Sequence, residues 1–388
     1  MKVSRKVSLA AGALAALWVA GFVFAARPTA QEQPRMRESI VGKKAGVYFK
    51  NVSTSTLKEL TVDDFIGAMG VMTDALGLDC ADCHPNAGSD QVDWVFDTAR
   101  KKTARRMVEM VGNLNKEFFG GAQRVTCWTC HHGRVIPATS IALNAVYEAP
   151  NSELDDFVPR DPEQPAATDV LDKFVAAVGG ARWSGVRNYV ASGSSIGFGG
   201  FGGDGEFTIF ANAPNQRTVR IQFPQHPDRG ISYWVYNGTN GFINTPRALL
   251  ENYDLIGGEL DGARLEALLA FPASIKGAMT NWRQGFRRVI GDSEYMTIQG
   301  NGPRGSLGTF YIDPKTYLLK RLVRYAPSPV GMVSVQIDYD DWKDAGNGVK
   351  LPFEYNFYWL DGRYTAKIKD YKFNTTIDPA IFTRPKNQ

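Results

Sequence analysis

Cysteine and histidine are scarce in this chain, with four of each among 388 residues. All four cysteines belong to two C-x-x-C-H motifs, residues 80–84 and 127–131, so none remains for a disulfide, a lipid anchor or a free reactive thiol. Basic and acidic side chains nearly balance at 44 and 40, which provides no charge excess for binding nucleic acid. The Gly-rich run 197–203 precedes no P-loop lysine, and therefore indicates a flexible loop. The cysteine motifs are thus the most informative feature.

A C-x-x-C-H motif is the attachment signature of c-type haem. Its two thiols lie on one helical turn and can both add to vinyl groups along one haem edge, while the next imidazole faces the iron. No further Cys/His pair completes a zinc tetrahedron; a redox dithiol is the remaining alternative, and it would show no Soret band. We expect two covalently bound haem c groups. The expected attachment residues are Cys80, Cys83, Cys127 and Cys130, and the expected iron-ligating histidines are His84 and His131.

The N-terminus has the pattern of an export signal. Lys2, Arg5 and Lys6 precede an apolar run, residues 7–26, which is also long enough to span a bilayer uncleaved. We expect residues 1–30 to be a signal peptide or an uncleaved membrane anchor. The rest of the chain would then lie in the periplasm or at the outer face of the cytoplasmic membrane, where haem attachment explains unpaired cysteines.

Helix signals precede each haem motif. One helix is expected to begin at Thr61, with an acidic first turn, and to end at Gly77; another is expected from about Asp93 to Asn115. The order helix, loop, haem motif therefore occurs twice, as in an internal duplication. We predict a mainly helical dihaem domain over residues 31–149.

Composition changes after this domain. Residues 150–167 are rich in Pro, Asp and Glu and are expected to form an extended linker. Residues 168–388 are expected to form an antiparallel sheet with one or two helices, at 168–178 and 263–270, so the chain has an α + β, two-domain fold. The expected strands are 207–211, 218–223, 231–236, 308–313, 318–325, 333–339, 353–359 and 364–373.

Each iron also needs a sixth ligand or an open position. His132 adjoins a proximal ligand and cannot easily reach the opposite haem face, and His226 is expected in a loop of the sheet domain. Methionine is the better candidate, although core packing is the alternative role for any of the four that precede the motifs. The candidates are Met69 and Met72 for the first haem, and Met107 and Met110 for the second.

Glycine distinguishes the first pair. Met69 lies in the segment Gly-Ala-Met-Gly, residues 67–70, and a glycine inside a helix costs about 1 kcal/mol relative to alanine. Two glycines beside one methionine suggest that a flat group such as a porphyrin packs there, which favours Met69 over Met72. No such feature ranks Met107 against Met110.

Segments 65–73, 104–110 and 125–131 resemble the cytochrome subunit of bacterial photosynthetic reaction centres, and the resemblance spans residues 41–144. That family usually carries four haems. Its second haem pair is absent here. A histidine that serves one of those haems in the family is also missing from residues 113–125.

The resemblance implies that the first methionine of each pair is the axial ligand. Met69 would then pair with His84, and Met107 with His131. Such His/Met ligation leaves no open coordination site and raises the reduction potential. These features favour outer-sphere electron transfer over enzymatic catalysis. The implied partners are electron-donor and electron-acceptor proteins, including a photosynthetic or respiratory membrane complex.

A basic cluster precedes Met107. A solvated helix face is one interpretation; pairing with haem propionates, in which Arg134 could join, is another, and a partner-docking patch is the third. The cluster consists of Arg100, Lys101, Lys102, Arg105 and Arg106.

The second domain resembles the periplasmic lipoprotein-carrier family, which implies a curved antiparallel half-barrel covered by helices, with an apolar ligand inside. The matching segments are 170–180, 206–211, 236–241, 311–319, 348–353 and 377–382. Five aromatic residues could line such a cavity, although ordinary sheet core is the favoured interpretation: Phe207, Phe210, Trp234, Phe357 and Trp359. A lipid-like or quinone-like ligand, or a protein partner, is expected. The alternative functions are an envelope ligand carrier with redox-sensing haems and a dihaem peroxidase.

Overall fold

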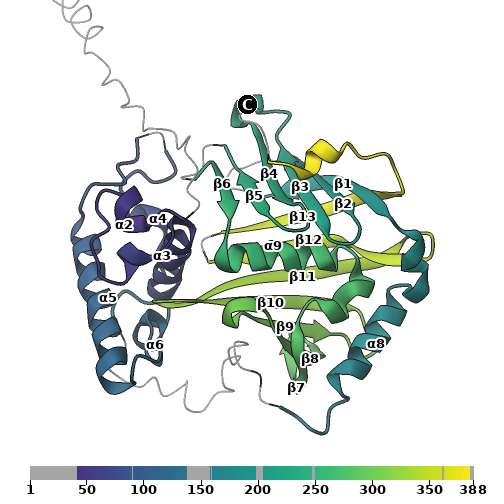
Figure 1. Ribbon diagram of the computed structural model, residues 1–388, viewed down its shortest axis with the longest axis horizontal. Coiled ribbons are helices and arrows are strands. Elements are labelled where there is room, and N and C mark those ends of the chain that lie inside the picture. The colour runs from purple at the N-terminus through teal and green to yellow at the C-terminus, as the bar shows by residue number, and fades with distance from the viewer. Residues whose placement is uncertain are drawn as a thin grey trace, which may run out of the picture.

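The computed structural model describes residues 42–89, 91–137, 158, 160–197, 204–246, 250–360 and 362–384. The expected signal or anchor, half of the expected linker and most of the Gly-rich run lie outside these ranges. Figure 1 shows a helical part, coloured purple to blue, beside a large sheet. Within the described ranges, no helix is both long enough and apolar enough to cross a membrane.

The helical part contains five α-helices in the residues described. The second begins and ends where the sequence predicts: the Thr61 hydroxyl accepts a hydrogen bond from the Asp64 amide, and Gly77 ends the helix with a φ of 63° in the left-handed region. The five helices are α2 (Ala45–Tyr48), α3 (Val62–Leu76), α4 (Cys80–Cys83), α5 (Ala99–Phe118) and α6 (Cys127–His131).

The predicted start of the second long helix, near Asp93, is wrong. Helix α5 begins at Ala99, because the Thr98 hydroxyl caps it by accepting a 3.2 Å hydrogen bond from the Lys101 amide. Asp93 instead accepts hydrogen bonds of 2.9 and 3.0 Å from the backbone amides two and three residues later, and these bonds stabilise a turn.

The rest of the described chain forms one open, curved sheet of thirteen antiparallel strands. The strand order is β6-β5-β4-β3-β2-β1-β13-β12-β11-β10-β9-β8-β7, so the first and last strands of the chain pair in the middle. All eight predicted strand segments coincide with strands. The strands are β1 (Asn188–Ile196), β2 (Asp204–Asn212), β3 (Gln216–Gln222), β4 (Ile231–Tyr236), β5 (Gly241–Asn244), β6 (Asn252–Leu255), β7 (Thr280–Ile290), β8 (Ser293–Asn301), β9 (Leu307–Ile312), β10 (Leu319–Ser328), β11 (Gly331–Gly346), β12 (Val349–Trp359) and β13 (Gly362–Phe373).

Two helices cover one face of this sheet, α8 (Ala167–Ala177) and α9 (Gly257–Leu269). Phe174 of α8 and Leu265 of α9 are each 1% exposed and belong to the same core as the inward side chains of the strands. The predicted α + β class and the half-barrel with covering helices are therefore confirmed.

The sheet and the helical part meet at the tip of the β10–β11 hairpin (Figure 1). Val330, in the hairpin turn, is 2% exposed and shares a small core with Val71 of α3 and Val108 of α5. Burying an isopropyl group of this kind is worth about 1.5–3 kcal/mol, so the hairpin contributes to the stability of the helical part.

Candidate haem-binding site

Two one-turn helices carry the cysteine motifs. Asp79 caps α4 by accepting hydrogen bonds of 2.8 and 3.1 Å from the Ala81 and Asp82 amides, and Thr126 caps α6 in the same way through Thr129. Each motif thus has its own capping box, which is why such short segments become helical. None of the four cysteines, all of which the structure describes, forms a disulfide, and they lie at exposed or half-buried positions. Burial raises the pKa of the Cys127 thiol, so that thiol stays protonated near neutral pH.

His131 is oriented by the chain that follows it. Its Nδ1 lies 2.8 Å from the carbonyl oxygen of Arg134. A carbonyl only accepts hydrogen bonds, so Nδ1 carries the proton and Nε2 keeps its lone pair free. An imidazole held in this way is suited to ligate a metal through Nε2.

His84 has a different environment. Its Nδ1 is buried and has no hydrogen-bond partner among the described residues, and its ring lies 5.0 Å from the ring of Trp94, centroid to centroid. Desolvation, followed by the nearby Lys101 ammonium, lowers the pKa of His84 to about 4. The imidazole is therefore neutral at physiological pH, as a metal ligand must be.

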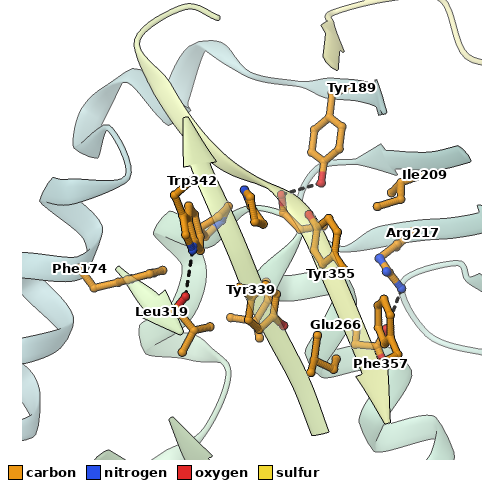
Figure 2. Close-up of a pocket in the computed structure, with 15 residues that line it drawn as sticks. Phe174, Tyr189, Ile209, Arg217, Glu266, Leu319, Tyr339, Trp342, Tyr355 and Phe357 are labelled. Atoms are coloured by element: carbon orange, nitrogen blue, oxygen red, sulfur yellow. Dashed lines mark hydrogen bonds and ion pairs between the residues drawn. The ribbon is translucent and has the colours of Figure 1, made fainter. Parts of the chain in front are cut away.

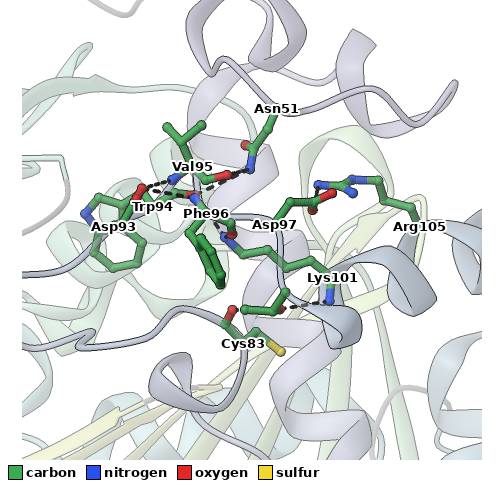
Figure 3. A network of polar contacts seen from close by, with 10 residues as sticks. Asn51, Cys83, Asp93, Trp94, Val95, Phe96, Asp97, Lys101 and Arg105 are labelled. Carbon is green, nitrogen blue, oxygen red and sulfur yellow. Dashed lines mark hydrogen bonds and ion pairs between the residues drawn. The ribbon is translucent and has the colours of Figure 1, made fainter.

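A buried lysine holds the segment that covers His84. The Lys101 ammonium donates hydrogen bonds of 2.9 Å to the carbonyl oxygens of both Trp94 and Phe96, and the Asn51 side chain donates a 2.9 Å bond to the carbonyl between them (Figure 3). Lys101 is only 9% exposed. The sequence assigned it merely to a basic cluster. Lys101 lies seven residues, or about two helical turns, before Val108, which is also buried on α5. This spacing places both residues on one face of the helix and could have predicted the burial of Lys101.

The other cations of the basic cluster have different surroundings. Arg100 pairs with Asp82 at 2.7 Å, and Arg105 pairs with Asp97 at 2.7 Å. Arg106 is exposed. Two of the arginines thus have protein carboxylates as partners, which supports the interpretation of a largely solvated helix face.

The glycines beside Met69 pack against the sheet. A Cβ at Gly67 would lie 3.3 Å from Val333, and one at Gly70 would lie 3.0 Å from Leu360. Their small size therefore permits close approach of the sheet rather than of a porphyrin. This finding removes the glycine argument for Met69 over Met72, although it leaves the family resemblance as an argument for Met69.

The four methionines divide by exposure. Met69 and Met72 are half-buried and pack on the small core shared with the β10–β11 hairpin. Met107 and Met110 are 37% and 47% exposed on α5. Neither histidine outside the motifs competes with them: His132 directs its Nε2 to within 3.1 Å of the Thr129 carbonyl oxygen, and His226 precedes a turn in the sheet part.

The helical part leaves unusually many large apolar side chains uncovered. They surround the two motif helices in sequence, and a porphyrin is the kind of broad apolar group that would cover such surface. With two thiols and a histidine in each motif, these residues fit covalent haem. The exposed residues are Val47, Val95, Phe96, Met107, Met110, Phe118, Phe119, Val135 and Ile136.

The expected ligand cavity of the sheet is small. The space between α8, α9 and the strands has a volume of about 30 Å³. Aromatic side chains, among them Tyr339, Trp342 and Tyr355, line it together with a 2.8 Å ion pair between Arg217 and Glu266 (Figure 2). That volume holds a water molecule or two and no acyl chain. A more open groove of about 470 Å³ crosses β1, β2 and β13 and is lined largely by polar side chains.

The five aromatic residues proposed as a lining are mainly ordinary core. Phe207 and Phe357 are buried, and Trp234 and Trp359 pack partly buried against the same core. Phe210 differs, because its ring centroid lies 5.7 Å from the guanidinium carbon of Arg220.

Comparison with known proteins gives two kinds of similarity. A DUF1329 family protein from Desulfovibrio piger has a TM-score of 0.40 and 10% identity, covering 57% of this chain and 98% of its own. A LolA superfamily protein from Nitrosomonas europaea has a TM-score of 0.38 and 11% identity, again covering 57% and 98%. No curated protein matches the chain. Residues 23–158, which contain both cysteine motifs, match the photosynthetic reaction centre cytochrome C subunit family, as the sequence resemblance indicated.

Proposed function

We propose that this protein is an exported dihaem c-type cytochrome that relays electrons by outer-sphere transfer. The observation that carries the proposal is the pair of capped one-turn helices, each of which presents two cysteines outside any disulfide and a histidine. The match of residues 23–158 to a cytochrome family supports the same conclusion.

Each motif would hold one haem. Cys80 and Cys83 would form the thioethers of the first, and Cys127 and Cys130 those of the second; haem c supplies a one-electron iron couple when bound. His84 and His131 are the proposed proximal ligands. Met69 and Met107 are the proposed distal ligands, on the strength of the family resemblance.

The residues of the chain have three tasks in this proposal. The Arg134 carbonyl accepts a hydrogen bond from Nδ1 of His131 and would leave Nε2 available to hold the iron. Trp94 and the segment around it exclude water from His84. The exposed side chains of α5, including Met107 and Met110, supply apolar cover for a ring.

Electron transfer between proteins is favoured over an enzymatic function. A dihaem peroxidase needs one iron with an open position, whereas each half of the helical part offers a methionine on the helix before the motif. A redox-sensing lipid carrier is disfavoured by the 30 Å³ cavity of the sheet. The proposed partners are protein electron donors and acceptors, with a photosynthetic or respiratory complex among them, at the periplasmic side of the cytoplasmic membrane.

The test is a haem count followed by a redox titration. The full chain, produced in a host that exports protein and attaches haem c, should give two haems per chain in a pyridine haemochrome assay. The double variants Cys80→Ala/Cys83→Ala and Cys127→Ala/Cys130→Ala should each retain one. Two n = 1 redox waves, unmoved by added quinone or phospholipid, are expected. Protein without a Soret band, or rapid peroxide turnover, would refute the proposal.

A further inference from the structure

The two proposed proximal histidines differ in what surrounds their second nitrogen. His131 donates from Nδ1 to the Arg134 carbonyl. His84 makes no such bond among the described residues, and the Trp94 residue whose ring lies against it accepts a hydrogen bond from the buried ammonium of Lys101. The first site thus has a feature that the second lacks.

From this difference we infer that Lys101 is a positioning and charge-tuning residue of the first haem site, whose buried ammonium raises the reduction potential of the haem attached at Cys80 and Cys83. The inference rests on the proposed function, because it concerns a haem at that motif. It gives a specific role to a residue that the sequence placed only in a basic cluster.

Geometry places Lys101 beside this motif. Thr98 is the N-cap of α5 and lies three residues before Lys101. Its hydroxyl donates a 3.2 Å hydrogen bond to the Cys83 carbonyl oxygen, so the start of α5 lies against the end of α4. Figure 3 shows Cys83 and Lys101 close to each other. The Lys101 ammonium then reaches back to the Trp94 and Phe96 carbonyls, and the Trp94 ring lies against His84. One side chain therefore fixes the cover of the ligand and places a positive charge next to it.

The charge is poorly screened. Lys101 is 9% exposed, and no carboxylate forms an ion pair with it among the described residues. The nearest acidic groups are Asp93, which caps a turn, and Asp97, which pairs with Arg105. Screening by salt acts mainly on exposed charges, so the ammonium keeps most of its effect on its surroundings.

The sign of the effect follows from electrostatics. Oxidation adds one positive charge at the iron, and a buried cation nearby disfavours that charge. The reduced form is stabilised, and the midpoint potential rises. Loss of the cation should therefore lower the midpoint of the first haem and leave that of the second unmoved.

Four variants of the full-length dihaem protein separate charge from structure. Lys101→Met removes the charge and both hydrogen bonds; Lys101→Gln removes the charge but retains an amide donor; Lys101→Arg keeps the charge. Lys102→Met removes the same charge from the adjacent exposed position and is the matched control. Midpoints are measured by spectroelectrochemical titration at low and high salt, with each haem identified in the single-motif cysteine variants.

The expected result is a lower midpoint for the Cys80/Cys83 haem in both Lys101→Gln and Lys101→Met, persisting at high salt. Lys101→Arg should restore it, and Lys102→Met should leave it unchanged. If Lys101→Met fails to fold, Lys101→Gln alone decides the outcome. Two haems with unchanged midpoints in the neutral variants, or an equal shift in Lys102→Met, would overturn the role of Lys101 while the dihaem proposal stands. Absence of haem from the native protein would overturn the proposed function itself.

Discussion

Gln123, in the loop before the second haem motif, donates a 2.7 Å hydrogen bond from its side-chain amide to the carbonyl oxygen of Ser328, which ends β10. The β10–β11 hairpin, to which Ser328 belongs, also buries Val330 between α3 and α5. The carbonyl oxygen of Val330 accepts a 3.4 Å hydrogen bond from the Cys127 amide. The sheet therefore contacts the cysteine motif itself.

Replacing Val330 should weaken the helical part. We expect Val330→Ser to lower its free energy of unfolding by about 2 kcal/mol, because one methyl is lost and a hydroxyl replaces the other in a site that is 2% exposed. Denaturant titration followed at the Soret band is the measurement. Val289→Ser, at a position 65% exposed, should change the value by no more than about 0.5 kcal/mol. Equal effects of the two variants would contradict a structural role for the hairpin tip.

The distal ligand of the second haem can be tested by exchange. Met107→His should lower one midpoint potential and leave the other nearly unmoved, because a methionine ligand raises the potential relative to histidine. Met110→Leu preserves apolar cover and should leave both midpoints unchanged. A shift in Met110→Leu, together with an unaltered titration of Met107→His, would assign the ligand to Met110.

Asp63 predicts a pH effect on stability. It is 7% exposed, and desolvation, followed in effect by the neighbouring Asp64, raises its pKa. A folded-state pKa above the unfolded value means that the folded state binds the proton more tightly. The contribution of Asp63 to the free energy of unfolding is therefore fully present below the unfolded-state pKa of about 3.9. This contribution is lost as the pH rises through the folded-state pKa.

Asp63→Asn should accordingly stabilise the protein at pH 7 and flatten the dependence of unfolding free energy on pH in the acidic range. Thermal unfolding between pH 4 and 7 provides the measurement. Asp169→Asn, in the exposed first turn of α8, is the control. Destabilisation by Asp63→Asn at neutral pH would show that the charged carboxylate makes a favourable contact.

The ion pair in the sheet core should behave as a coupled unit. The Arg217 and Glu266 side chains are 11% and 23% exposed and lie 2.8 Å apart. Arg217→Met should cost about 3 kcal/mol because Glu266 keeps a charge without its partner, whereas Arg217→Met/Glu266→Gln should cost less than the single variant. Chemical denaturation of the double-mutant cycle measures the coupling. For comparison, Lys343→Met removes an exposed partner of Asp341 and should cost under about 1 kcal/mol. Additive effects of the core pair would show that the two charges are solvated independently.

Local signals predicted much of this structure. Thr61 and Gly77 predict the ends of α3 because helix capping depends on residues close together in the sequence. The C-x-x-C-H motifs can be identified in the sequence for the same reason, since haem attachment needs side chains from neighbouring residues. Strands β1, β5, β6, β7 and β8 were not predicted, and β7 and β8 are the most instructive of these. The former reads Thr-Asn-Trp-Arg-Gln-Gly-Phe-Arg-Arg-Val-Ile, and its position at the edge of the sheet tolerates charged side chains that obscure alternation.

Non-local contacts were beyond the sequence. Gly67 and Gly70 accommodate Val333 and Leu360, more than 200 residues away, and nothing in the helix identifies that partner. Lys101 is likewise one cation among five in the sequence, and only the start of α5 at Ala99, capped by Thr98, places it on the buried face of the helix.

The second haem motif also rests on the first helix. The amide of Gly133 donates a 2.9 Å hydrogen bond to the carbonyl oxygen of Ala75, and a side chain at Gly77 would collide with the Gly133 backbone. The two repeats of helix and motif are consequently interlocked rather than strung in series. A fragment cut between them would leave the end of α3 without the contacts that Gly133 provides.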